Sequence, residues 1–376
     1  MELEFTDEQD ELRDGVRAML SRECPMSLVR SVIEDGTSAD GLWKQMVDLG
    51  WPALTIPEEH GGLGLGAIEL AVVVEELGRV VAPGPFIPTV SQLVPVVRET
   101  ASAEQQARLL AAVAEGSLTG TLALEEPGVA FDPAGVRACA TTKGDGWELA
   151  GTKHGVLGAV GVDEIAVVAR VAGTTGDDGI GVFLVAADDL EISPVAALDM
   201  TRSLANITLD GVTVTADRVL GEPGPATAAG LRRAIEEAIV AISLETVGTC
   251  QTILDVTLEY AKQREQFGVP IGSFQAIKHK FADMLIALER ARATGLFAAL
   301  TIAEDDERRS IAASTAKVAA GDCQRLLAKE GIQIHGGIGF TWEHDMHIYV
   351  RRVKTGGQLL GTGADHRARI ADLLGI

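Results

Sequence analysis

Two stretches set this chain apart: residues 260–271 read YAKQREQFGVPI, and residues 333–340 read QIHGGIGF. Both lie in a region whose apolar residues recur with a helical period from Thr227 to the end of the chain. Between them, one face of a long amphipathic helix is marked by Ile277, Phe281, Met284, Leu285 and Leu288. Long helices usually pack as bundles, so we expect a C-terminal four-helix bundle over residues 223–376.

The helical pattern also occupies the N-terminal part of the chain. Thr6-Asp7-Glu8-Gln9 fits a capping box, and the helix that follows has an apolar face made by Leu12, Val16, Met19 and Leu20. Further helices are predicted at 40–49, from about Ala67 to Gly78, and at 103–114. We therefore expect an N-terminal all-α domain over residues 1–117.

Near residue 117 the period changes from that of helices to that of strands. Short segments rich in Val and Ile, such as 164–170, 180–185 and 207–209, are separated by Gly/Asp turns. The turn at 173–179 reads GTTGDDG, which predicts a hairpin tip. These features predict a middle antiparallel β-domain over residues 118–222, and the fold class is α+β.

Composition argues against several classes of function. The chain has 376 residues and a formal net charge of −22, so nucleic acid and an anionic membrane surface are poor partners, because both require a basic patch. The start, MELEFTDEQDELR, lacks the apolar segment of a signal peptide, and we find no run of about 18 apolar residues that could span a bilayer. The cysteines form no CxxC pair and are expected to be buried reduced thiols, which favours a cytoplasmic protein: Cys24, Cys139, Cys250 and Cys323.

Three motifs, in order, resemble the acyl-CoA dehydrogenase family over essentially the whole chain. The first is Leu42-Trp43 with LGW at 49–51 and PEEHGGLG at 57–64. The second is the 260–271 stretch, followed by Phe274-Gln275 and Ala282-Asp283-Met284. The third is HGGIGF at 335–340, with Arg351 and Arg352 beyond it. The resemblance implies FAD as cofactor, an acyl-CoA substrate, an electron-transfer acceptor, and an oligomer in which one subunit reaches into its neighbour's flavin site.

The residue types in these motifs suit the nucleotide end of FAD. Arg264 offers a guanidinium fork that matches a pyrophosphate, and Phe267 can pack on the adenosine portion. Glycines let the backbone approach a cofactor closely, although Gly336-Gly337 could also be a tight turn. A surface role for Arg264 and a core role for Phe267 are the alternatives. The predicted cofactor-binding residues are Arg264, Phe267, Gln275, Gln333, Gly336 and Gly337.

The segments that hold the flavin ring in the family depart from its pattern here. Residues 125–132 read EEPGVAFD, so Glu125 and Phe131 stand where the family has Thr and Ser hydroxyls. Residues 153–158 read KHGVLG, so Gly155 replaces an aromatic lid and Leu157 replaces a hydroxyl donor. A carboxylate at Glu125 would repel a reduced flavin, and Phe131 would crowd a phosphate.

The catalytic carboxylate is displaced as well. The family's Glu before a C-terminal Gly-Thr is Leu360 here, and its second location, on the long helix before the Arg-x-x-Phe-Gly motif, is Ala238. Glu245 lies two helical turns beyond Ala238 in an apolar stretch and is the candidate base, with structural hydrogen bonding as its alternative role. Glu236 and Glu237 are expected on a solvated face, although Glu237 would serve as base if the register is off by one. His344 and His347 have no third ligand with convincing spacing, so we expect no metal.

The losses all fall on the ring-binding half of the site, and the retained residues belong to the half that serves a neighbour. The sequence therefore predicts a non-catalytic subunit that supplies FAD nucleotide contacts to a second, catalytic acyl-CoA dehydrogenase subunit in a heterotetramer. The resemblance extends to the smaller subunits of the α2β2 enzymes of actinobacterial steroid side-chain degradation. One alternative is a self-sufficient homotetramer with Glu245 or Glu237 as base. Another is a flavin-free binding or scaffold protein on the same fold.

Overall fold

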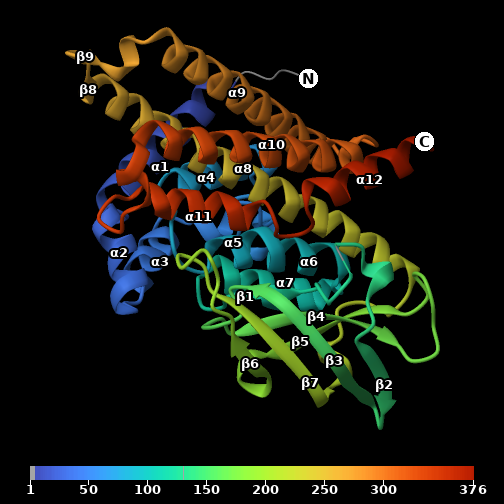
Figure 1. Cartoon of the computed structure of the whole chain (residues 1–376). Coiled ribbons are helices and arrows are strands. Elements are labelled where there is room, and N and C mark those ends of the chain that lie inside the picture. The colour runs from blue at the N-terminus through green and yellow to red at the C-terminus, as the bar shows by residue number, and fades with distance from the viewer. Residues whose placement is uncertain (1–4, 130) are drawn as a thin grey trace.

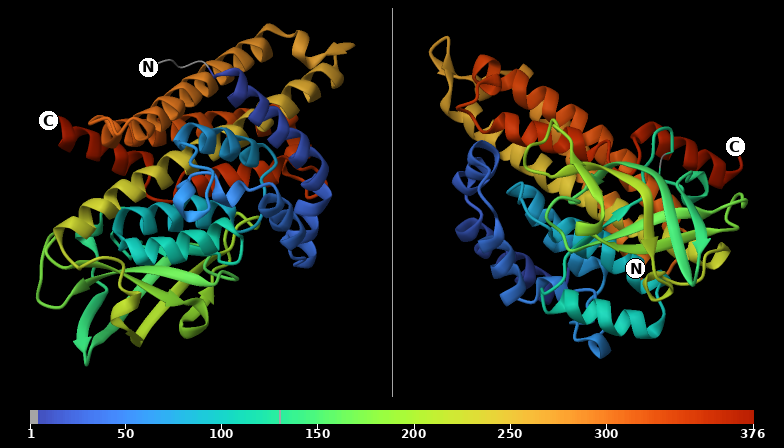
Figure 2. Two further views of the ribbon diagram at one scale, coloured as in Figure 1. Left: turned by 180° about the vertical axis from the view of Figure 1, so that it is seen from behind. Right: turned by 90° about the horizontal axis from the view of Figure 1, so that it is seen from below.

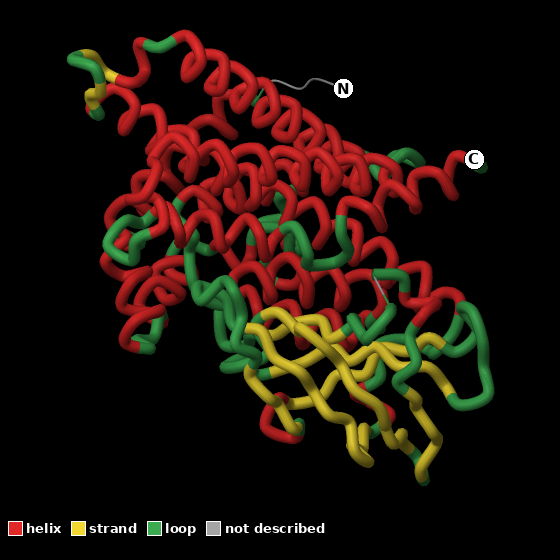
Figure 3. The backbone as a smooth tube through the Cα atoms, in the orientation of Figure 1, coloured by secondary structure: helices red, strands yellow, loops and turns green. Residues whose placement is uncertain are grey.

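The computed structural model describes residues 5–129 and 131–376. The first four residues of the acidic N-terminal stretch and Ala130, within the 125–132 segment, lie outside the described residues. Helices gather into one body, and a β-domain lies at one end of it (Figures 1 and 3). The order along the chain is helical, then β, then helical, which confirms the predicted α+β class.

In its described part the N-terminal region consists of helices and the loops between them. The capping box at Thr6 is confirmed, because the Thr6 hydroxyl accepts from Gln9 N at 3.2 Å and the Gln9 side chain accepts from Thr6 N. The predicted helices at 40–49, 67–78 and 103–114 appear within a residue or two of these bounds, whereas the helix at Met26–Asp35 was not predicted. The helices are α1 (Asp7–Glu23), α2 (Met26–Asp35), α3 (Asp40–Asp48), α4 (Ala67–Arg79), α5 (Phe86–Pro88), the π-helical turn Thr89–Leu93, α6 (Val94–Thr100) and α7 (Ala103–Ala114).

The β-domain holds a seven-stranded sheet of order β1-β4-β2-β3-β7-β6, with β5 paired to β4. The strands are β1 (Gly120–Ala123), β2 (Cys139–Lys143), β3 (Gly146–Leu157), β4 (Glu164–Val171), β5 (Ile180–Ala186), β6 (Glu191–Pro194) and β7 (Leu204–Val214). β4 and β5 form the hairpin predicted around residues 173–179. The sheet is mixed rather than wholly antiparallel, because β1 and β2 each pair with β4 in parallel.

The C-terminal region is built on α8 (Pro225–Gln263), α9 (Gln275–Ala303) and α10 (Arg309–His335), which pack on one another. α11 (Met346–Gly356) packs on α8, and α12 (Gly363–Leu374) packs on α10. Contrary to the expectation that no stretch could span a bilayer, a window of α8 has a mean hydropathy of 1.3 and would pass by length and composition alone. Since 78% of that window is buried inside the protein, α8 is a core helix.

The N-terminal helices and the bundle share one core, because α4 lies directly against α8. A Cβ at Gly78 would stand 2.0 Å from the Glu245 carbonyl oxygen, and one at Gly248 would stand 1.8 Å from the Glu75 carbonyl oxygen. Only glycine permits backbones to approach this closely. The contact fixes α8, and with it Glu245, against the N-terminal region.

A short hairpin joins α8 to α9 and consists of β8 (Glu265–Gln266) and β9 (Val269–Pro270). It projects from the end of the helical body remote from the β-domain, and the three orientations of Figures 1 and 2 agree on this. The predicted apolar face of α9 is divided: Met284 and Leu288 are buried, whereas Leu285 is exposed beside exposed Ile286. Two apolar side chains of α9 therefore face outward in this chain.

Candidate functional site

The β8–β9 hairpin presents one aromatic side chain to the outside. Phe267 is 94% exposed, and its ring meets Phe274 edge to face at a centroid distance of 6.2 Å. Phe267 and Gly268 form the turn with φ of 56° and 82°, the left-handed pair that a two-residue hairpin turn requires. A phenylalanine held at positive φ with its ring in solvent is costly. The core role considered for Phe267 is therefore wrong, and the conformation points to a surface that contacts something else.

The other predicted cofactor residues gather at the same end of the bundle. Arg264 follows the last turn of α8, Gln275 opens α9, and Gln333 lies in the last turn of α10; all three are exposed. The ends of α8 and α10 are joined by Tyr260, whose ring stacks on His335 at 4.4 Å and whose hydroxyl donates to the His335 carbonyl at 3.4 Å.

The glycine loop leaves α10 at this same end. Gly336 has φ of 65°, and a Cβ at Gly336 or Gly337 would have no described atom within 4 Å. The backbone of this loop is therefore open to a neighbour or ligand. All six predicted residues are thus exposed at this end of the bundle, and we call them the far-end surface: Arg264, Phe267, Gln275, Gln333, Gly336 and Gly337.

The departures from the family pattern also come together, in a different place. Glu125, Gly155, Leu157 and Leu360 line one cavity, where the β-domain meets the segment between α11 and α12. Its volume is about 20 Å³, which is room for little more than a water molecule. We call this the ring site, because it is where the family pattern places a flavin ring.

Two hydrogen bonds close the ring site, one made by the Leu360 N–H and one made by the Leu360 carbonyl. The Leu360 N–H donates to Glu125 Oε1 at 2.7 Å, and the Leu360 carbonyl lies 2.9 Å from His366 Nε2. Burial raises the pKa of the Glu125 carboxyl, while the bond from Leu360 acts in the opposite direction. Burial lowers the pKa of His366 to about 4. Neutral His366 thus donates from Nε2 to the carbonyl, and its Nδ1 accepts from the Ser314 hydroxyl at 3.2 Å.

Phe131 completes the closure. Its ring stacks on His366 at a centroid distance of 4.2 Å and an interplanar angle of 4°, and only 7% of the residue is exposed. The Arg369 guanidinium lies over the Phe131 ring, 5.3 Å from the ring centroid. Gly361, at φ of 92°, has no room for a side chain, because a Cβ would stand 2.4 Å from the Phe131 ring. Phe131 is thus a packed core residue.

A second cavity of about 310 Å³ opens beside Phe131. Three carboxylates line it, from Asp132, Asp365 and Asp372, together with the guanidinium groups of Arg232 and Arg369. Both arginines already have partners: Arg232 pairs with Asp132 at 3.1 Å and with Asp177 at 2.6 Å, and Arg369 pairs with Glu236 at 2.8 Å. A phosphate here would meet more carboxylates than uncommitted cations.

The candidate bases are held in ion pairs. Glu245 is fully buried; its Oε1 accepts from Arg352 Nη2 at 2.5 Å, and its Oε2 accepts from Arg202 Nη2. Ala238, at the family's second base position, is buried and cannot take a proton. These contacts favour the structural alternative for Glu245.

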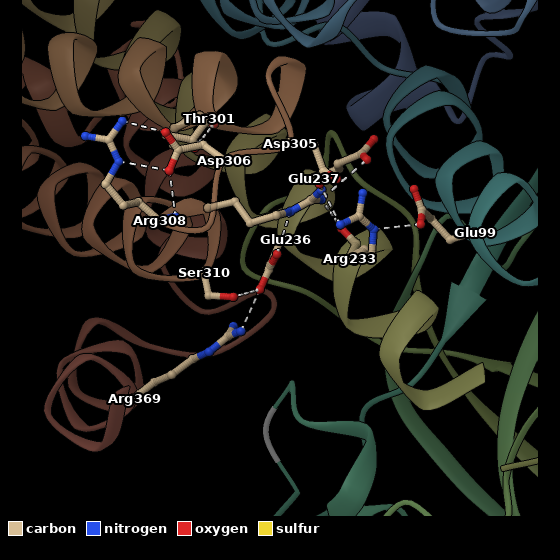
Figure 4. Close-up of polar contacts among 12 residues, drawn as sticks. Glu99, Arg233, Glu236, Glu237, Thr301, Asp305, Asp306, Arg308, Ser310 and Arg369 are labelled. Atoms are coloured by element: carbon tan, nitrogen blue, oxygen red, sulfur yellow. Dashed lines mark hydrogen bonds and ion pairs between the residues drawn. The ribbon is translucent and has the colours of Figure 1, made fainter. Parts of the chain in front are cut away.

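The expectation that Glu236 and Glu237 face solvent is wrong. Glu236 is buried and accepts from Arg309 at 2.9 Å, from Arg369 at 2.8 Å and from the Ser310 hydroxyl (Figure 4). Glu237 accepts from Arg98 Nη2 at 2.5 Å. This face of α8 is covered by α6, α10 and α12. The sequence of α8 alone does not show that these helices pack there.

Sequence reasoning missed three buried charged groups near these sites. Lys153 pairs with Glu126 at 2.6 Å inside the β-domain, and Lys317 donates to the Gly356 carbonyl at 2.6 Å. Burial lowers the pKa of Lys317 to about 7 and that of Lys153 to about 8. Arg202 pairs with Glu245. The available signal was a charge within an apolar run, such as Lys317 in AASTAKVAA.

The histidines after the glycine loop bond to the protein itself. His344 Nδ1 accepts from Met346 N at 3.1 Å, and His347 Nε2 lies 3.3 Å from the Trp342 carbonyl. Within residues 5–129 and 131–376 no group of three or more His, Cys, Asp or Glu side chains is placed to hold a metal ion. Cys24, Cys250 and Cys323 are buried free thiols, and Cys139 is a partly exposed one.

Comparisons with known proteins agree over nearly the whole chain. Residues 6–117 match the model of the acyl-CoA dehydrogenase N-terminal domain, and residues 231–375 match that of the C-terminal domain. Acyl-CoA dehydrogenase IpdE2 of Mycobacterium tuberculosis is 32% identical over 356 residues, which cover 94% of this chain and 93% of that protein. Among solved structures, a variant of the Tcur3481-Tcur3483 steroid ACAD superposes with a TM-score of 0.87 at 33% identity, covering 98% of each chain. The ChsE4-ChsE5 complex from Mycobacterium tuberculosis has a TM-score of 0.89 at 27% identity, covering 100% of this chain and 99% of that one.

Proposed function

Since this chain belongs to the acyl-CoA dehydrogenase family of flavin-dependent oxidoreductases, we propose that it is the non-catalytic subunit of a hetero-oligomeric member. Its far-end surface would hold the nucleotide end of an FAD whose ring is bound by a catalytic partner subunit. The partner would supply the ring-binding hydroxyls, the aromatic lid and the base that this chain has lost.

The closed ring site is the observation that carries this proposal. Small-molecule sites have volumes of roughly 300–1,000 Å³, whereas the ring site holds about 20 Å³. Opening it would break the Glu125–Leu360 hydrogen bond and unstack Phe131 from His366. The adjacent cavity is lined by three carboxylates, which would repel a pyrophosphate. This half of the chain does not fit FAD.

The far-end surface does fit the nucleotide half of FAD. Exposed Arg264 can bind a pyrophosphate through its planar fork, Phe267 presents an aromatic face, and the Gly336-Gly337 backbone is accessible. Bound FAD would supply the hydride acceptor for the acyl β-carbon, while a base on the partner would take the α-proton. The residues of this chain would bind and orient the cofactor. Because the β8–β9 hairpin lies at the end of the helical body remote from the β-domain (Figure 1), an FAD bound there would have its ring on another subunit.

The comparisons support a hetero-oligomer and a substrate class. Two of the similar structures are named by two components each, Tcur3481-Tcur3483 and ChsE4-ChsE5, and the first is described as a steroid ACAD. By analogy, the proposed substrate is an acyl-CoA thioester on a steroid side chain, with a separate electron-transfer acceptor. The self-sufficient homotetramer is disfavoured, because Glu245 and Glu237 are both committed to arginines.

The test is flavin retention by the chain with and without its partner. Purified alone, the chain should be colourless and should not reduce an acceptor dye with an acyl-CoA. Co-purified with a second acyl-CoA dehydrogenase chain that carries the missing Thr, Trp and Glu, it should retain FAD. Arg264→Ala should lower the FAD content of that complex, whereas Arg22→Ala, at an exposed arginine in α1, should not. A yellow, active chain on its own would refute the proposal, and a complex without flavin would support the scaffold alternative.

A further inference from the structure

Two aromatic rings stack next to the far-end surface without belonging to it. Tyr260, in the last turn of α8, lies against His335, the last residue of α10, with an interplanar angle of 23° between the rings. Tyr260 is half-buried, and only 3% of His335 is exposed. Because His335 is covered by the protein, a role of this pair in cofactor binding must act through the residues that it holds.

On one side, the stack holds the arginine that precedes the β8–β9 hairpin. The Arg264 N–H donates to the Tyr260 carbonyl at 2.8 Å, and the Arg264 carbonyl accepts from the Ile271 N–H at 2.8 Å. Beyond the hairpin, the chain returns to α8, since a Cβ at Gly272 would stand 3.0 Å from the Ala261 carbonyl oxygen. The backbone of Arg264 is therefore fixed by the turn of α8 that carries Tyr260.

On the other side, the stack holds the glycine loop. The Nδ1–H of His335 donates to the Gly331 carbonyl at 2.7 Å, one turn back in α10, and Gly336 follows His335 directly. The loop then folds back on the histidine, because a Cβ at Gly339 would stand 3.0 Å from the His335 Cβ. Beyond the loop, the ring of His344 meets that of His335 edge to face at a centroid distance of 4.8 Å. His335 is thus enclosed by the loop that it precedes.

The rings, rather than the Tyr260 hydroxyl, carry the contact between these two segments. The hydroxyl lies 3.4 Å from the His335 carbonyl oxygen, which is long for a hydrogen bond. The ring centroids are 4.4 Å apart, and aromatic pairs at such distances stabilise a contact beyond the area that they bury. One turn earlier, α10 already lies close to α8, since a Cβ at Gly331 would stand 2.9 Å from the Ile253 side chain. The stack extends this close packing to the ends of both helices.

We propose that Tyr260 and His335 are positioning residues for FAD binding. Their stack sets the distance between Arg264 and the Gly336-Gly337 backbone, so that both can contact the same nucleotide. Groups that share one ligand bind it more tightly when they are already in place, because ordering them on binding costs affinity. The inference rests on the proposed function, since it concerns how the far-end surface holds the nucleotide end of FAD.

The test uses the purified hetero-oligomer, stripped of flavin and titrated with FAD and with FMN while flavin fluorescence is followed. FMN lacks the adenylate half, so it does not report on the far-end surface. Tyr260→Leu removes the ring, and Tyr260→Phe keeps the ring without the hydroxyl. His335→Asn keeps a donor for the Gly331 carbonyl but has no ring to stack. Trp147→Leu is the control, because Trp147 is a half-buried ring in the β-domain, 5.7 Å from that of Phe183.

Tyr260→Leu and His335→Asn should each weaken FAD binding about fivefold to tenfold, and the affinity for FMN should stay the same. Tyr260→Phe and Trp147→Leu should leave both affinities unchanged. In the Arg264→Ala background, Tyr260→Leu should cause a smaller loss of FAD affinity, because the arginine that it positions is gone. Should Tyr260→Leu prevent assembly of the hetero-oligomer, His335→Asn takes its place in each comparison.

Three results would overturn the inference: equal losses of FAD and FMN affinity, the same loss in Tyr260→Phe as in Tyr260→Leu, or fully additive effects of Arg264→Ala and Tyr260→Leu. A loss of FAD affinity in Arg264→Ala but not in Tyr260→Leu would also overturn it and would leave the proposed function standing. Unchanged FAD affinity in Arg264→Ala would instead contradict the proposed function itself.

Discussion

Replacing Phe131 by alanine is expected to lower the free energy of unfolding by about 3 kcal/mol. Truncating a buried Phe costs about 3–5 kcal/mol in general, and Phe131 is 7% exposed, stacked on His366 and packed against Gly361. The value lies at the low end because the neighbouring cavity of about 310 Å³ lets water reach the space that the ring leaves. The variant should remain free of flavin, because the Glu125–Leu360 hydrogen bond still closes the ring site.

The measurement is urea unfolding followed by tryptophan fluorescence, with the change taken from the shift of the midpoint. Phe267→Ala is the matched control, because it makes the same chemical change at a residue that is 94% exposed; its midpoint should not move. A loss below about 1 kcal/mol for Phe131→Ala would show that the ring is not packed. Uptake of FAD by this variant alone would show that Phe131 was the only obstacle to the cofactor. Either result would refute the account of the closed ring site.

Three further outcomes follow from the same contacts. In the complex, Phe267→Ala should increase the rate at which FAD dissociates, measured by flavin fluorescence after dilution; an unchanged rate would remove Phe267 from the site. Glu245→Gln should lower the free energy of unfolding by about 3–5 kcal/mol, because it leaves Arg202 and Arg352 with an uncompensated buried charge; lost turnover by the complex at unchanged stability would instead mark Glu245 as a base. Burial lowers the pKa of His366 from 6.5 to about 4, so the unfolded chain binds an extra proton between these values, and stability should fall by up to about 3 kcal/mol as the pH drops from 6.5 to 4. His366→Gln should remove that part of the pH dependence, and identical profiles for both chains would contradict it.

Much of the fold could be predicted because it depends on interactions between residues that are close in the sequence. The capping box at Thr6 and the turn at 173–179 act over a few residues, and both appear as predicted. The parallel pairing of β1 and β2 with β4 was not predictable, because alternation of apolar residues says which face is buried but not which strand lies alongside. The length of the apolar stretch in α8 was not predicted, because the buried glutamates of α8 interrupt that stretch in the sequence.

The ring site could be predicted at positions where the residue present cannot make the contact that a flavin needs. Glu125, Gly155, Leu157 and Leu360 were singled out separately, and the structure places them around one cavity. The closing of this cavity could not be predicted from the sequence, because His366 helps to close it only through its contacts with Leu360 and Phe131. Glu236 and Glu237 were misplaced for the same reason, because elements distant in sequence cover that face of α8.

The FAD content of the purified hetero-oligomer tests the central claim most directly. If this chain contributes only far-end surfaces, its own ring site stays closed, and only the partner's ring sites are filled. The account therefore predicts one FAD for each pair of chains, and none for this chain purified alone. One FAD for every chain, or flavin bound to this chain by itself, would contradict it.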